Sequence, residues 1–322
     1  MASLCFYSGS IFNYNNCHTR TTDFHIRKQI CSSRTKSMAV ITTEPDVSRR
    51  SANYDPSIWS FDHAQSLSSK YVGECYTAKA HTLKEAVKPM IHKVENPLST
   101  LELVDDLQRL GISYHFENEI SEVLDMIYYN HFKTHKKWSS MDLNLKAVGF
   151  RLLRQHGYQV PQGIFGNFKD KTQDLNMVGV LNLYEASYHS FEGEGILDEV
   201  RDFTTKYLQE NIKKVDGSTI WLLVSHALEL PLHWRVPRVE AKWFIEVYEK
   251  RSDMNPTLIK LAKLDFNMVQ AIHIEDLKHA SRWWRNTKWD NKLTFARDRL
   301  VENFLWTTCV GYQPHFSEEG EL

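Results

Sequence analysis

The sequence predicts an all-α protein; two observations support this fold class, and a third bears on its architecture. From about residue 60 onward, apolar residues recur at intervals of three and four, the spacing of one face of an α-helix. No segment of alternating residues with an Asn-Gly or Asp-Gly turn indicates a β-hairpin. No repeat recurs at a fixed period, which argues against a regular helical solenoid. We therefore expect many short antiparallel helices, each of which buries one face against its neighbours.

The first helix with clear end signals is expected between residues 99 and 111. Ser99 and Glu102 have the spacing of a capping box, in which the two side chains satisfy free N–H groups at a helix start. The residues that follow place leucines on one face and a glycine at the expected C-terminal cap: Leu103, Leu107, Leu110 and Gly111.

Further apolar stripes at helical spacing follow along the chain. Gly157 and Pro161 end the stripe that begins at Leu145, and Pro231 and Pro237 separate the stripe that begins at Leu197 from the one that begins at Val239. The stripes consist of Ile120, Val123, Leu124 and Ile127; Leu145, Val148 and Leu152; Leu197, Val200 and Leu208; Val239, Trp243 and Val247; and Leu258, Leu261 and Val269.

The first 48 residues have the composition of a targeting segment. Between Met1 and Thr43 the only acidic residue is Asp23, whereas basic and hydroxyl residues are frequent. This composition is typical of a transit peptide for a plastid or a mitochondrion, and no apolar core of a secretory signal is present. The alternative is a disordered tail, which has no reason to avoid acids. We expect a transit peptide and exclude the segment from the fold.

Bulk properties exclude several classes of function. The formal net charge of −1 gives no long-range attraction to nucleic acid or to an anionic membrane, so neither is an expected partner. The five cysteines are widely spaced and form neither a disulfide framework nor a Cys-x-x-Cys zinc site. No nucleotide-binding glycine loop, zinc-protease helix or serine-hydrolase elbow occurs.

A series of long motifs resembles the plant terpene synthase family, of the monoterpene type. Arg49 and Arg50, eight further residues and then Trp59 match the N-terminal signature of plant monoterpene synthases. The other matching stretches follow in the family's order: LELVDDLQRLGISYHF (101–116), FRLLRQHGYQVPQGIFGNFKD (150–170), LYEASYHSFEGEGILDE (183–199), VSHALELPLHWRVPRVEAKWFIEVY (224–248), KLAKLDFNMVQAIH (260–273), LKHASRWWRN (277–286) and FARDRLVENFLW (295–306).

The resemblance implies a division of the chain into three parts. Residues 1–48 would be a plastid transit peptide, which implies the chloroplast stroma. Residues 49–255 would be the helical N-terminal domain of the family. Residues 256–322 would be the start of its class I metal-binding catalytic α-domain, truncated before the Asp-Asp-x-x-Asp motif.

The resemblance also implies a reaction. The family ionises an allylic diphosphate such as geranyl diphosphate, with Mg²⁺ or Mn²⁺ neutralising the leaving group. Arg297 and Arg299 match the family's Arg-x-Arg element, and planar guanidinium groups suit a released diphosphate. Trp306 matches an aromatic residue of the cation pocket, with core packing as the alternative. Without the resemblance, the arginines read as a surface charge cluster.

The carboxylates that the metal would need are missing from the 322 residues. Asp105 and Asp106 are followed by Arg109 where a third acid would stand, so we expect solvated or salt-bridged positions on a helix. We therefore expect no metal ligand and no catalytic residue in this chain, and no metal ion bound to it.

Three hypotheses remain open at this point. The chain is an inactive truncated synthase, a fragment of a functional monoterpene synthase, or a non-catalytic all-α interaction module. Residues 256–322 would lack the helices against which their family counterparts pack, which predicts exposed apolar faces and poor solubility.

Overall fold

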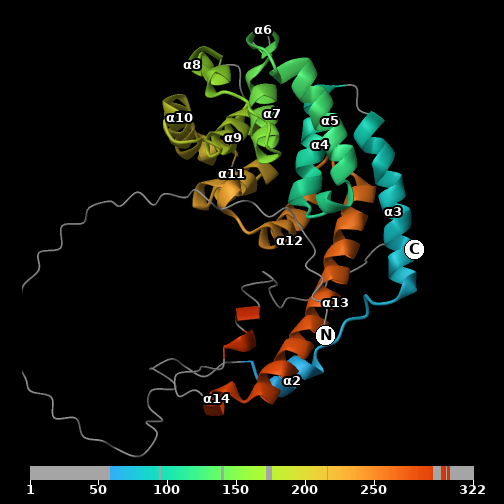
Figure 1. Ribbon diagram of the computed structural model, residues 1–322. Helices are drawn as coiled ribbons and strands as arrows, with labels where there is room; N and C mark the ends of the chain where they lie inside the picture. Colours follow the sequence, from blue (N-terminus) through green and yellow to red (C-terminus); the bar gives the residue numbers. More distant parts are fainter. Residues whose placement is uncertain are drawn as a thin grey trace, which may run out of the picture. The chain divides into compact units, whose positions relative to one another are not determined.

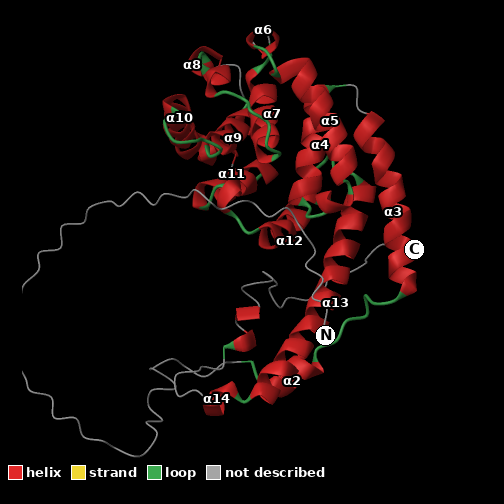
Figure 2. Ribbon diagram, viewed as in Figure 1, coloured by secondary structure: helices red, strands yellow, loops and turns green. Residues whose placement is uncertain are grey.

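The computed structural model describes residues 59–93, 96–138, 141–171, 176–215, 217–292, 299–301, 303 and 304. Within these ranges it contains helices joined by short loops and no strand (Figures 1 and 2). The all-α fold class is confirmed. None of the helices in these ranges combines the length and the apolar character needed to cross a bilayer.

The α-helices of the described ranges are α2 (Phe61–Ser66), α3 (Glu74–Lys93), α4 (Pro97–Arg109), α5 (Glu117–Ile127), α6 (His135–Trp138), α7 (Leu143–Gln155), α8 (Phe168–Lys171), α9 (Met177–Ser187), α10 (Gly195–Asn211), α11 (Thr219–Glu229), α12 (Pro237–Tyr248), α13 (Pro256–Thr287) and α14 (Trp289–Lys292). Shorter turns of 3₁₀ or π type are η1 (Ser113–His115), η2 (Tyr128–Phe132), η3 (Gln162–Phe165), η5 (Ile212–Val215) and η6 (Leu232–Trp234).

Contacts divide the chain into two compact units. The first comprises Ser57–Lys288 and Asp298–Leu322 and contains the hydrophobic core described below. The second comprises Met1–Pro56 and Trp289–Arg297, of which the structure describes α14. The predicted boundary between residues 255 and 256 stays a prediction.

Helix α4 begins three residues earlier in structure than its sequence signals suggest. The Asn96 side chain accepts a hydrogen bond from the Leu98 N–H at 3.0 Å, and Pro97 occupies the first turn. An Asn cap followed by Pro is a strong start signal, because proline lacks the N–H that would otherwise be unsatisfied. The capping box at Ser99 is therefore wrong. Helix α13 starts in the same way, with Asn255 as the cap and Pro256 after it.

The end of α4 agrees with its sequence signals. Gly111 has a φ of +75°, a conformation that glycine adopts without steric cost. A Cβ at this position would lie 2.9 Å from the Cβ of Ala241 on α12, so the glycine also permits close approach of the two helices. Leu107 and Leu110 are fully buried, and Leu103 packs partly buried against the same core.

Most of the other predicted stripes form the core, with one clear exception. Ile120, Val123, Leu124 and Ile127 are all buried, as are Leu197, Val200 and Leu208. On α12, however, Val239 is 55% exposed, so its predicted burial is wrong. Val247 of the same stripe is buried as predicted, and the other buried residues of this helix are Glu240, Ala241, Phe244, Ile245 and Tyr248.

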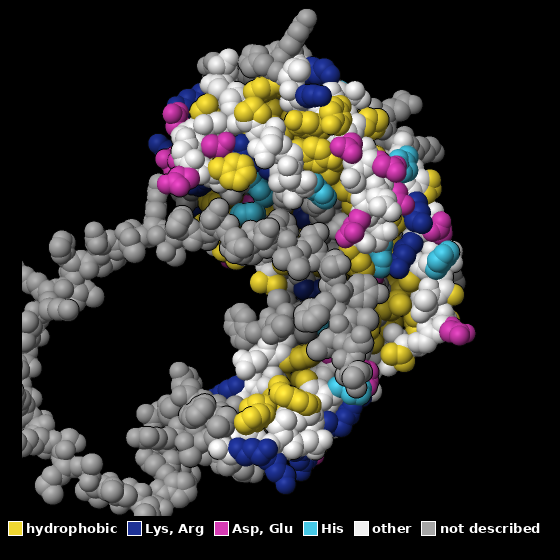
Figure 3. Space-filling model, viewed as in Figure 1, with side chains coloured by type: hydrophobic (Ala, Val, Ile, Leu, Met, Phe, Trp, Pro, Cys, Tyr) yellow, Lys and Arg dark blue, Asp and Glu magenta, His cyan; other side chains and the backbone are white. Residues whose placement is uncertain are grey.

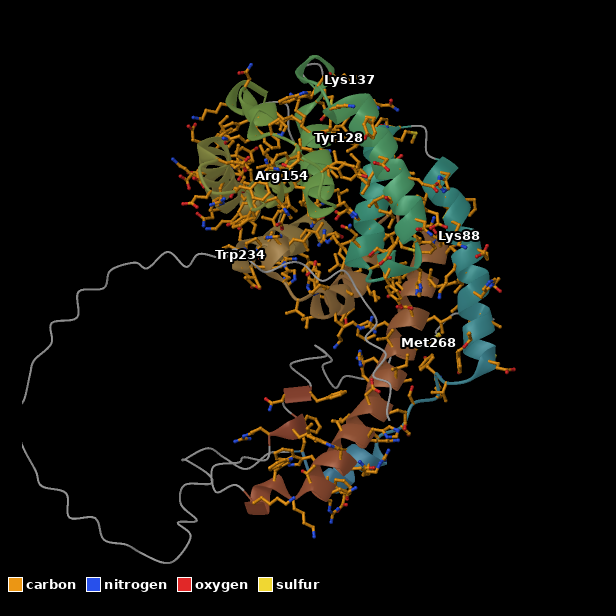
Figure 4. All side chains as sticks on the ribbon, in the orientation of Figure 1. Lys88, Tyr128, Lys137, Arg154, Trp234 and Met268 are labelled. Carbon is orange, nitrogen blue, oxygen red and sulfur yellow. The ribbon has the colours of Figure 1, made fainter. Side chains whose placement is uncertain are left out.

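Helix α13 is integrated into the core along its first half. Leu258, Ile259, Leu261, Ala262 and Phe266 belong to the main hydrophobic cluster. Farther along, Leu264, Met268 and Ala271 pack with Tyr71 and Ala80, and α3 runs beside α13 (Figures 1 and 4). This half of α13 therefore has partners, contrary to the expectation that the segment from residue 256 lacks them.

Candidate functional site

Two of the predicted site residues lie within the described part of the chain. Arg299 is half-buried and directly precedes a helical turn, in which the N–H of Asn303 donates to the Arg299 carbonyl at 2.9 Å. Trp59 is half-buried just ahead of α2. Four further predicted residues lie outside the described residues: Arg49, Arg50, Arg297 and Trp306.

A small hydrophobic cluster brings Trp59 and the Arg299 segment to the same place. Its buried members are Ala64 on α2, Leu277 on α13 and Val301, which follows Arg299 by two residues. Partly buried Trp59, Leu67 and Phe304 pack against them. The tryptophan of the N-terminal signature and the second arginine of the Arg-x-Arg element thus adjoin one cluster, although they are far apart in sequence.

Helix α2 is held on α13 by the side chain of Gln65. Its amide nitrogen donates to the Lys278 carbonyl at 3.1 Å and to the Ser281 hydroxyl at 2.7 Å. Its amide oxygen accepts a hydrogen bond from the Arg282 guanidinium at 2.7 Å. Phe61 lies one turn before Gln65 on α2, and the centre of its ring is 4.3 Å from the guanidinium group of Arg285 on α13. Sequence reasoning missed Gln65, because no motif or spacing distinguishes this glutamine.

The surroundings of this contact are basic. Lys278, Arg282 and Arg285 lie on the part of α13 that contacts α2, and Figure 3 shows Lys and Arg side chains in dark blue on the lower part of the face it draws. Arg282 and Arg285 are exposed there, and Lys278 forms an ion pair with Glu275 at 2.8 Å. Such an excess of positive charge favours an anionic ligand over a cation.

His273 lies beside Phe304, in surroundings that disfavour its charged form. Its ring centre is 6.5 Å from that of Phe304. Burial lowers the pKa of His273, and the nearby Arg238 guanidinium lowers it further. A neutral imidazole adds no positive charge at this position.

Asp105 and Asp106 are engaged in ion pairs on α4, which confirms the salt-bridged alternative. The Asp105 carboxylate lies 3.0 Å from the Arg151 guanidinium, and that of Asp106 accepts from Arg251 at 2.8 Å. Among the residues that the structure describes, no three His, Cys, Asp or Glu side chains meet in a group that could hold a metal ion. The described residues therefore do not fit a divalent-metal site, and no step through a metal is assigned to them.

A buried charge network in the helical unit was also missed by sequence reasoning. Glu240 on α12 accepts from Arg109, Arg235 and His226 at distances between 2.9 and 3.0 Å. Arg235 also lies 3.8 Å from Glu185, whose carboxylate accepts from the Leu232 N–H. These hydrogen bonds tie the loop between α11 and α12 to Glu185 and Glu240.

The sequence of this chain is similar to those of known terpene synthases. Residues 58–228 match the family model described as "Terpene synthase, N-terminal domain". The chain is 64% identical over 323 residues to R-linalool synthase QH5, chloroplastic, of Artemisia annua, and the alignment covers 98% of this chain and 54% of that protein. It is 53% identical over 279 residues to (-)-alpha-terpineol synthase of Vitis vinifera, covering 85% of this chain and 47% of the relative. The chain spans about half the length of the curated relatives it matches.

Solved structures of terpene synthases also resemble this chain. A limonene synthase with 2-fluorolinalyl diphosphate superposes with a TM-score of 0.75 at 44% identity, over 81% of this chain and 50% of that one. An isoprene synthase from grey poplar leaves, in complex with three Mg²⁺ ions and dimethylallyl-S-thiolodiphosphate, superposes with a TM-score of 0.67 at 40% identity. That match covers 79% of this chain and 48% of the poplar protein.

Proposed function

The chain belongs to the terpene synthase family, and from this membership we propose that it contributes the helical N-terminal domain of a protein that makes a monoterpene from geranyl diphosphate. The relatives named above are synthases of linalool and terpineol, and their alignments with this chain cover most of its length. The observation that carries the proposal is the common cluster of Trp59, Val301 and Phe304, because it brings the tryptophan of one signature next to the residues that follow Arg299 of the other.

In this proposal, Arg297 and Arg299 hold the diphosphate after it leaves the prenyl chain. A guanidinium group offers a planar fork of donors that matches phosphate oxygens. Fixed positive charge also keeps the released anion from recombining with the carbocation. Trp306 would present an aromatic face to that cation, and Arg49, Arg50 and Trp59 form the N-terminal signature that accompanies the site.

The divalent metal of the family would act as a Lewis acid on the diphosphate. The 322 residues contain no Asp-Asp-x-x-Asp sequence, and the described residues offer no substitute for it. We accordingly propose that this chain does not turn over geranyl diphosphate when it is purified by itself.

A chimaera tests the proposal directly. This chain replaces the matching portion of R-linalool synthase QH5, and the purified product is supplied with geranyl diphosphate and Mg²⁺. We expect a C10 alcohol or hydrocarbon by gas chromatography and mass spectrometry. Arg299→Ala in the chimaera should lower the rate roughly a hundredfold, the usual effect of removing one donor to developing negative charge.

Two controls make the result interpretable. The first is unmodified R-linalool synthase QH5, assayed in parallel. The second is Lys206→Ala, because the side chain of Lys206 is 78% exposed and lies on α10, outside the site. A folded chimaera that forms no volatile product, or one in which Arg299→Ala behaves like Lys206→Ala, would contradict the proposal.

We further propose that residues 1–48 direct the protein to plastids. The composition of this segment and the word "chloroplastic" in the names of two Artemisia relatives support the proposal. A fluorescent protein carrying residues 1–48 should accumulate in chloroplasts of transfected leaf cells. Replacing Arg20, Arg27, Lys28, Arg34 and Lys36 by Glu should leave it in the cytosol, and mitochondrial accumulation of the unmodified fusion would refute plastid targeting.

A further inference from the structure

We propose that Gln65 is a positioning residue that orders the Arg299 segment by fixing α2 on α13. The inference rests on the proposed function, because that function gives Arg299 its role. It goes further in naming a side chain, distant in sequence from the arginines, on which their placement depends.

The first step of the argument is the weakness of α2 as an isolated helix. It has six residues, far fewer than the roughly 12–15 that an isolated helix needs to be even marginally stable in water. Its conformation and position must therefore come from contacts with the rest of the unit. Ser60 caps its first turn by accepting from the His63 N–H, but this bond is local and does not locate the helix.

The second step is the arrangement of hydrogen bonds between α2 and α13. Gln65 uses both its amide nitrogen and its amide oxygen on α13, over the single turn that spans residues 278–282. Ser281 is 4% exposed, so the bond to its hydroxyl is shielded from water. Ser281 also donates to the Lys278 carbonyl, which makes the acceptors for Gln65 part of one local network. The contact consequently fixes α2 along and around α13.

The third step links α2 to the arginine segment. Ala64 is adjacent to Gln65 in sequence and is 1% exposed, buried against Leu277 and Val301. Val301 follows Arg299 by two residues, and Phe304 packs against the same cluster. A surface formed by α2 and α13 together therefore supports the turn that follows Arg299. If α2 detaches, this turn loses its packing against Ala64 and Trp59.

Hydrogen exchange of the 322-residue chain tests the inference without any catalytic assay. Gln65→Ala should speed exchange of the protected amides among residues 61–66 at least about tenfold, because it removes three modest hydrogen bonds. It should also speed exchange in residues 300–304, which follow Arg299. Ser281→Ala should act in the same direction, and Gln65→Ala combined with Ser281→Ala should exceed the larger single effect by little.

The matched control is Gln209→Ala, an exposed glutamine on α10. Neither Gln65→Ala nor Gln209→Ala should change exchange in α5, whose buried face lies in the main core. Faster exchange confined to residues 61–66, with residues 300–304 unchanged, would mean that Gln65 holds α2 alone, and the positioning role would be refuted.

Binding of inorganic pyrophosphate, measured by calorimetry, separates this inference from the proposed function. We expect Arg299→Ala and Gln65→Ala each to weaken binding severalfold, and the double variant to be no weaker than Arg299→Ala. If exchange responds as expected but Arg299→Ala leaves pyrophosphate binding unchanged, the proposed role of Arg299 fails while the positioning by Gln65 stands. If Arg299→Ala weakens binding and Gln65→Ala does not, the positioning role is refuted and the proposed function stands.

Discussion

Arg154 and Glu194 form a two-point ion pair inside the helical unit. The two terminal nitrogens of the guanidinium group each donate to a different carboxylate oxygen at 2.6 Å. Arg154 also donates to the carbonyl groups of Val160 and His189, and its side chain is 5% exposed. One arginine on α7 thus joins the chain after α7 to the chain before α10.

We expect Arg154→Ala to lower the free energy of unfolding by about 3–5 kcal/mol, because it removes a buried guanidinium group and leaves the half-buried Glu194 carboxylate with only the Phe191 N–H as a donor. Arg154→Lys should recover only part of this loss, since an ammonium group cannot reproduce the planar fork. Urea denaturation followed by circular dichroism measures both. The control is Lys169→Ala, which breaks a pair with Glu199 in which both side chains are 63% exposed, and should cost at most about 1 kcal/mol. Equal losses for the two alanine variants would contradict the assignment.

Glu240 predicts a pH dependence of stability. Burial by itself raises its pKa, but hydrogen bonds and charges from His226, Arg109 and Arg235 outweigh burial and lower the pKa to about 2. The unfolded chain has the ordinary value of 4.5, so the unfolded state binds a proton first as the pH falls. The stability that Glu240 contributes is therefore fully present above about pH 4.5 and is lost progressively toward pH 2.

The measurement is the urea midpoint between pH 7 and pH 2, for the wild type and for Glu240→Gln. The wild type should lose stability between about pH 4.5 and pH 2. The variant should be less stable at pH 7 and should show a shallower decline over this window. Parallel pH profiles for the two proteins would show that Glu240 is not the group responsible.

Gly149 on α7 lies where no larger residue fits. A Cβ built at this position would overlap the ring of Phe132, which is 2% exposed and belongs to the main core. Alanine favours a helix by up to about 1 kcal/mol over glycine, so propensity alone predicts a gain. We expect the clash to dominate, and Gly149→Ala to destabilise the protein by roughly 1–3 kcal/mol.

Two variants check this explanation by thermal and urea unfolding. Gly195→Ala, at the first residue of α10, places its Cβ where no atom lies within 4 Å, and should be neutral or slightly stabilising. Phe132→Leu combined with Gly149→Ala should cost less than the sum of the two single changes. Additive costs would indicate that the ring is not what Gly149 accommodates.

Features that depend on residues close together in the sequence could be predicted, whereas features that depend on contacts between distant segments could not. The stripe of Ile120, Val123, Leu124 and Ile127 could be read directly, because helical periodicity is a local property. The face of α12 could not, since apolar side chains also occur on its exposed side, as Val239 does, while buried Glu240 lies next to it. The start of α4 was missed because an Asn-Pro signal and a capping-box pattern lie three residues apart, and the former prevails.

The candidate site was predictable only through motifs. Trp59 and Arg299 were singled out by the family signatures that contain them, and the shared cluster with Val301 is a contact between distant segments that no spacing reveals. The same holds for Gln65, whose partners on α13 lie 213 and 216 residues away. Pairings at such separations depend on the tertiary packing of the helices, which the local pattern does not encode.

Truncation tests the predicted boundary between residues 255 and 256. The first half of α13 contributes Leu258, Ile259, Leu261, Ala262 and Phe266 to the main core. Each large apolar side chain contributes about 1.5–3 kcal/mol by burial, so their removal costs an amount comparable to the 5–15 kcal/mol stability of a typical domain.

We expect a chain of residues 57–255 to be aggregated or to lack a cooperative melt. A chain of residues 57–288, which keeps α13, should melt cooperatively in differential scanning calorimetry. If residues 57–255 form a monodisperse protein as stable as the longer chain, α13 contributes nothing essential to this core and the boundary at residue 255 separates independently folding parts.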